Sequence, residues 1–157
     1  GHGASQGGPD GYKDFTEQDH QNSIHDVEMG VELLHSHGYQ TIFLVGASIG
    51  ANLAIQYAAT HKDIKKVIAL SAGTNYRGVV TPPFVEALSE DQSIYFVGDE
   101  DDRRSSGDSA AEMARALYDS KKGKKYLELM QGSGHGTDML AEHPDFSDRL
   151  IEWLRVK

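Results

Sequence analysis

Apolar residues follow two patterns along this chain: short continuous runs, and positions three or four residues apart. The runs predict buried strands at Ile42–Val45, Val67–Ser71, Ser93–Val97 and Lys124–Met130. The spaced positions predict helices at about Asn22–His37, Ala51–Thr60, Pro82–Leu88 and Ser109–Ser120, with a last one starting at Pro144. Strands that alternate with helices indicate β-α-β units. The predicted fold is therefore a three-layer α/β/α domain with a mostly parallel sheet of about four strands.

Three stretches show neither pattern and are expected to be loops or irregular. They are the glycine-rich start at Gly1–Gly11, the polar stretch Tyr12–Gln21, and the connection Thr74–Thr81. The sequence shows no internal repeat, low-complexity tract or interdomain linker, so residues 1–157 are expected to form a single domain.

Composition narrows the possible partners. The formal net charge of −9 argues against nucleic acid or an anionic membrane surface, because binding phosphates needs basic patches. With no cysteine, the chain has no disulfide, thiolate metal site or cysteine nucleophile, but this leaves the cellular compartment open. The eight histidines form no metal-binding motif, so we predict neither a metal nor a cofactor.

A serine between two glycines separates the first predicted strand from the helix that follows it. The stretch Gly46-Ala47-Ser48-Ile49-Gly50 has the form Gly-x-Ser-x-Gly, and its strand–turn–helix context predicts a nucleophile elbow. There the serine occupies a strained turn, and residues without a Cβ let strand and helix pass close together. The alternative interpretation is an ordinary turn whose serine caps the helix.

Two further reactive groups follow later predicted strands. An acid lies in the loop Asp99–Asp102, and His135 follows the fourth strand. Because ligands bind beyond the carboxyl ends of parallel strands, Ser48 and these groups are expected at one edge of the sheet. His135 would take the proton of Ser48, and the acid would orient the imidazole. His143 is the rival for the base.

Three motifs in this order resemble the α/β-hydrolase family, in particular small serine esterases and dienelactone-hydrolase-like proteins. The segments that carry the resemblance are Gly46–Gly50, Gly98–Asp102, Gly134–Gly136 and, for a turn after the family's fourth strand, Gly1–Ser5. The resemblance implies a serine hydrolase that cleaves small-molecule carboxylic esters through an acyl-enzyme. Thioesters and amides remain open as substrates, because fold and triad do not set the substrate.

The resemblance also implies roles for single residues. The family's acid stands three residues after the glycine that ends the strand, which selects Asp101, with Asp102 as the main competitor and Asp99 as a lesser one. The backbone N–H of Ile49 would bind the oxyanion. Residues expected to line the substrate pocket are Tyr76, Arg77 and Phe84.

The sequence departs from the family before its first residue. The family has four earlier strands, one of which would pair with Ile42–Val45, and a loop that supplies a second oxyanion donor. An apolar strand left as a bare edge promotes aggregation. We therefore expect this chain to be the C-terminal portion of the full fold, or a homo-oligomer in which another copy covers the edge. A non-catalytic interaction module is the alternative function.

Overall fold

The computed structural model of the protein describes residues 4–5, 7–103 and 107–156. Its main sheet is parallel throughout, with the strand order β1-β2-β5-β6. The strands are β1 (Leu44–Ala47), β2 (Lys66–Leu70), β5 (Ser93–Asp99) and β6 (Lys125–Met130). This confirms the predicted mostly parallel sheet.

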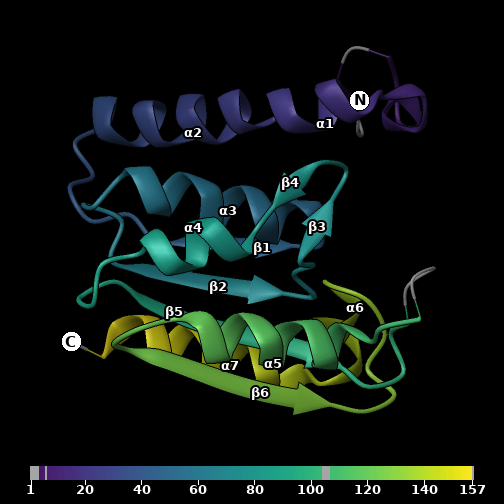
Figure 1. Cartoon of the computed structure of the whole chain (residues 1–157). Coiled ribbons are helices and arrows are strands. Elements are labelled where there is room, and N and C mark those ends of the chain that lie inside the picture. The colour runs from purple at the N-terminus through teal and green to yellow at the C-terminus, as the bar shows by residue number, and fades with distance from the viewer. Residues whose placement is uncertain (1–3, 6, 104–106, 157) are drawn as a thin grey trace.

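Helices cover both faces of the sheet and complete the three predicted layers (Figure 1). In Figure 1, α3, α4 and α5 lie on one face and α7 on the other, while α2 packs on the outside of α3. The helices are η1 (Gly11–Asp14), α1 (Glu17–Asn22), α2 (Ile24–Ser36), α3 (Ile49–Thr60), α4 (Pro82–Ala87), α5 (Ala110–Ser120), α6 (Asp138–Glu142) and α7 (Pro144–Arg155).

Strand β2 shows why the sheet holds these layers together. Val67 and Ala69 belong to the core cluster beneath α3 and α5, while Ile68 and Leu70 belong to the cluster beneath α7. All four are at most 2% exposed. A strand with apolar side chains buried on both faces gives the continuous apolar run that predicted it.

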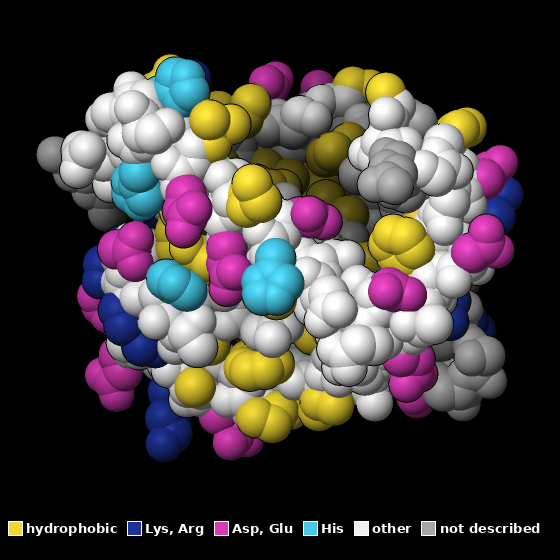
Figure 2. Space-filling view, turned by 90° about the horizontal axis from the view of Figure 1, so that it is seen from above, with side chains coloured by type: hydrophobic (Ala, Val, Ile, Leu, Met, Phe, Trp, Pro, Cys, Tyr) yellow, Lys and Arg dark blue, Asp and Glu magenta, His cyan; other side chains and the backbone are white. Residues whose placement is uncertain are grey.

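Strand β1, which precedes the serine, pairs only with β2 among the described strands. It begins at Leu44 rather than at the predicted Ile42, and Val45 is 55% exposed. Viewed from above, the molecule is hollowed, with hydrophobic side chains inside the hollow (Figure 2). On α2, Met29 and Leu33 are also largely exposed. Because β1 has one partner strand and Val45 is exposed, the strand that leads to the serine is an open edge of the described sheet.

Two stretches expected to be irregular are ordered. Within Tyr12–Gln21 the chain forms η1 and most of α1, because Thr16 and Asp19 make a capping box that starts the helix. Between Thr74 and Thr81 it forms an antiparallel hairpin of β3 (Asn75–Tyr76) and β4 (Val79–Val80).

Helix α6 was also not predicted, since five residues are too short to show periodicity. In the described part of the chain, no helix has the length and apolarity needed to cross a bilayer.

Candidate active site

Ser48 occupies a sharp turn between β1 and α3. Its φ of 55° and ψ of −126° are strained for a residue with a side chain. A Cβ on Gly46 would lie 2.2 Å from the carbonyl oxygen of Gly50, so only glycine fits there. At Gly50 itself, an added Cβ would meet nothing within 4 Å in the described structure. The packing reason expected for both glycines therefore holds for Gly46 alone.

The backbone after Ser48 turns at once into a helix. Ile49 is the first residue of α3, and the first N–H groups of a helix have no acceptor within the helix. These N–H groups carry the positive end of the helix dipole. Ile49 lines the same pocket as Ser48.

His135 is paired with an aspartate from the loop after β5. Its Nδ1 lies 2.8 Å from Oδ2 of Asp102. The Asp102 side chain is only 8% exposed, whereas that of His135 is 37% exposed. An ionised carboxylate accepts a hydrogen bond, so Nδ1 carries the proton and donates a hydrogen bond to Oδ2 of Asp102. This tautomer leaves Nε2 as the basic nitrogen of the ring.

The structure places Asp102, and not the predicted Asp101, against His135. Asp101 is exposed, and its carboxylate accepts a hydrogen bond from the N–H of Gly132. Asp99 explains the difference, because β5 extends to Asp99 and its buried Oδ1 accepts the N–H of Asp101 at 2.7 Å. The backbone of Asp101 is thus bonded to Asp99 and its side chain to Gly132, whereas Asp102 faces the histidine.

Asp99 also joins the acid loop to the histidine loop. Its second oxygen accepts the N–H of Ser133 at 2.6 Å, so one fully buried carboxylate holds both segments. Ser133 Oγ in turn lies 2.6 Å from Nε2 of His143, the predicted rival for the base. His143 is therefore engaged in the support of this loop, and it is not among the residues that line the pocket of Ser48.

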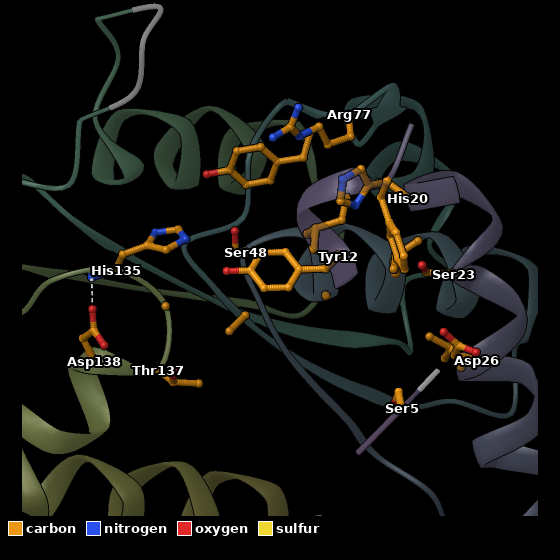
Figure 3. Close-up of a pocket in the computed structure, with 18 residues that line it drawn as sticks. Ser5, Tyr12, His20, Ser23, Asp26, Ser48, Arg77, His135, Thr137 and Asp138 are labelled. Carbon is orange, nitrogen blue, oxygen red and sulfur yellow. Dashed lines mark hydrogen bonds between the residues drawn. The ribbon is translucent and has the colours of Figure 1, made fainter. Parts of the chain in front are cut away.

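A cavity of about 970 Å³ opens over Ser48. Ser48 and His135 both point into it, with the imidazole of His135 extending toward Ser48 (Figure 3). Of the side chains predicted for the substrate pocket, Tyr76 and Arg77 line this cavity. Phe84 does not, because it packs against the hydrophobic core beneath α4.

The N-terminal segment contributes to the cavity in a way the sequence did not indicate. Its wall includes Tyr12, Phe15, His20 and Asp26, from η1, α1 and α2 and the links between them. His20 lines the cavity, and its ring lies edge-on to Phe15. The Thr16–Asp19 capping box was the one local signal of this helical segment.

The predicted turn at the start of the chain cannot be placed. Gly1, His2 and Gly3 lie outside the described residues. Among the residues that are described, no group of three or more His, Asp or Glu side chains is arranged to hold a metal ion.

Residues 1–105 match the family described as alpha/beta hydrolase fold. The chain belongs to the alpha/beta hydrolase fold family. Among curated proteins, none matches the sequence at a significant level.

Solved structures of this family superpose well on the chain. The Pyrococcus furiosus esterase Pf2001 matches with a TM-score of 0.70 at 15% identity, over 84% of this chain and 60% of the esterase. An alpha-beta serine hydrolase homologue from Coxiella burnetii matches with a TM-score of 0.68 at 17% identity, over 99% and 65% of the two chains.

A larger protein shares the same fold. The acylaminoacyl peptidase of Pyrococcus horikoshii matches with a TM-score of 0.65 at 11% identity, over 87% of this chain and 28% of the peptidase. At these identities the matches show the fold alone. This chain spans about 60% of the length of the esterase it resembles.

Proposed function

We propose that the protein is a serine hydrolase that cleaves carboxylic esters through an acyl-enzyme. The observation that carries the proposal is the hydrogen bond between His135 and Asp102, in a loop that delivers the imidazole to the pocket of a strained serine. A serine, a basic imidazole and a supporting carboxylate are the groups that acyl transfer needs.

In the proposed reaction, Oγ of Ser48 attacks the ester carbonyl carbon while Nε2 of His135 accepts the hydroxyl proton. Asp102 stabilises the imidazolium and keeps Nδ1 protonated. When the tetrahedral intermediate collapses, the C–O bond to the alcohol breaks and His135 protonates the departing oxygen. Water then attacks the acyl carbonyl while His135 accepts its proton. The acyl–Oγ bond breaks, the carboxylic acid leaves, and His135 returns the proton to Oγ of Ser48.

The N–H of Ile49 is the proposed donor to the oxyanion. It comes from the residue after the nucleophile, the position used by nucleophile elbows. Each such donor is worth about 10²–10³ in kcat, since it stabilises charge that exists only in the transition state. The wide cavity, walled by Tyr12, Tyr76 and Arg77, is the proposed binding site for the ester.

The proposal is tested with a fluorophosphonate probe and a panel of p-nitrophenyl esters of increasing acyl length. The wild-type protein should be labelled at Ser48 and hydrolyse at least one ester. Ser48→Ala should lose both properties. Ser120→Ala is the matched control. The Ser120 hydroxyl donates a hydrogen bond to the carbonyl of Leu117 at the end of α5, away from the pocket, so this variant should retain labelling and ester hydrolysis.

The same panel separates neighbouring functions. Faster cleavage of a thioester or an N-acylaminoacyl anilide would assign the triad to thioesterase or peptidase chemistry instead. A wild-type protein that resists the probe and cleaves none of these substrates would contradict the enzymatic function and favour a non-catalytic module.

A further inference from the structure

Ser71 is a buried serine that neither the motif nor the proposed chemistry requires. It follows the last residue of β2, is 0% exposed and has a φ of 49°. A left-handed backbone is strained for a residue with a Cβ. Glycine would adopt this conformation without that strain. Contacts of the Ser71 side chain are therefore expected to offset this strain.

The hydroxyl of Ser71 touches both of the other loops of the site. It donates a hydrogen bond to Oδ2 of Asp102 at 3.0 Å and accepts one from the N–H of Gly136, also at 3.0 Å. One hydroxyl can do both, since it has one proton and two lone pairs. Loops that follow β2, β5 and β6 thus meet at a single oxygen atom.

Both of these contacts act on His135. Oδ2 of Asp102 is the same oxygen that accepts the proton of His135 Nδ1, so Ser71 holds the carboxylate that orients the ring. Gly136 is the next residue after His135, so the second bond fixes the backbone that carries the ring. Ser71 thereby holds both the carboxylate that binds the imidazole and the backbone next to His135.

Little space separates Gly136 from the residue before Ser48. A Cβ on Gly136 would lie 3.3 Å from the Cβ of Ala47, the residue before the nucleophile. The histidine loop therefore packs directly against the elbow. A shift of the Gly136 backbone would change the distance between His135 and Ser48, and reactions of this kind depend steeply on such distances.

We propose that Ser71 is a positioning residue, whose hydroxyl locks Asp102 and the backbone at Gly136 so that His135 faces Ser48. The proposal rests on the proposed hydrolase function. Ser71 does not touch the substrate; it acts through the acid and the histidine. The strained backbone serves to direct the hydroxyl into the junction of the three loops.

Two substitutions separate the hydroxyl from the backbone. Ser71→Ala removes the hydroxyl and keeps the strain, whereas Ser71→Gly removes both. Each should lower kcat for the best p-nitrophenyl ester by about 10- to 100-fold with KM unchanged, because ground-state binding does not involve the junction. Ser93→Ala, which alters a buried serine at the opposite end of the sheet, should keep kcat within twofold of wild type.

Proton NMR gives a reading that does not depend on activity. The Nδ1 proton of His135, hydrogen-bonded to Asp102, should give a far-downfield resonance in the wild type and in Ser93→Ala. In both Ser71 variants it should broaden or disappear. If the wild type proves inactive, this measurement still tests the role of Ser71, so the two proposals fail separately.

Three results would overturn the inference. One is a kcat within twofold of wild type in both Ser71 variants. Another is a loss in Ser71→Ala that Ser71→Gly restores, which would assign the effect to backbone conformation. The third is an unchanged His135 resonance in variants that remain folded by circular dichroism.

Discussion

Ser48 and His135 lie in one pocket, but the chain positions them by different means. Ser48 is placed by backbone geometry: a strand, a strained turn and a helix that Gly46 allows to pass within contact. His135 lies on a loop placed by side chains from elsewhere, chiefly Asp99, Ser71 and Asp102.

This difference predicts two kinds of failure. Changing the elbow should disturb the fold, because the contact there is between backbone segments that cannot move apart independently. Changing the acid that faces the histidine should leave the fold largely intact and remove the orientation of one ring.

The largest effect is expected for Asp102→Asn. An amide cannot hold Nδ1 of His135 protonated as a carboxylate does, and the same change in a protease with a Ser-His-Asp triad lowers kcat by about 10⁴. Steady-state ester hydrolysis measures it. Asp101→Asn is the matched control, since Asp101 bonds Gly132 instead, and it should cost less than about tenfold. A loss confined to Asp101→Asn would return the role of acid to the residue that the family spacing selects.

Gly46→Ala tests the elbow. Its new Cβ would meet the carbonyl of Gly50 at 2.2 Å, so urea denaturation should show a free energy of unfolding lower by about 3 kcal/mol or more. Gly50→Ala has open space and replaces a helical glycine, so it should gain up to about 1 kcal/mol. Equal destabilisation by both would show that close backbone approach is not what the elbow requires.

The smallest effect is expected for Asp91, which lies just before β5 at its amino end. Hydrogen bonds from Lys65, at 2.6 Å, and from Ser89 lower the pKa of Asp91 from 3.8 to about 2. In the unfolded chain the Asp91 carboxylate binds a proton at a higher pH than in the folded protein. Ionised Asp91 therefore stabilises the fold above pH 3.8, and this contribution is lost as the pH falls toward 2.

Asp91→Asn should therefore flatten the decline of thermal stability over that pH range, measured by circular dichroism melting. Because Asp91 precedes β5 at its amino end, ester hydrolysis at neutral pH should not change. An undiminished decline in the variant would assign the acid sensitivity to other carboxylates.

The fold was predictable because its signals are local. A strand buried on both faces appears as a run such as Val67–Leu70, and the elbow appears as glycines around Ser48. The N-terminal segment was missed because its short helices bury too little apolar surface to show periodicity, although the Thr16 capping box marks the start of α1. The hairpin was missed because its strands have two residues each.

The site was only partly predictable, because part of it depends on contacts between distant residues. Which acid faces His135 follows from where β5 ends and from the bond between Asp99 and the N–H of Asp101. Neither can be judged from a run of four acidic residues. Ser71 carries no motif at all; its role depends on a backbone angle and on residues 31 and 65 positions away.

The open edge of β1 has a consequence for how this protein responds to heat. Strands bonded on one side only exchange their amide protons sooner and open at lower free energy than interior strands such as β2. Ser48 follows β1 and His135 follows β6, and both are edge strands of the described sheet, whereas Asp102 follows the interior strand β5. Warming should therefore open these two edge strands before β2 and β5, so the positions of Ser48 and His135 should be lost while the interior of the sheet is still folded.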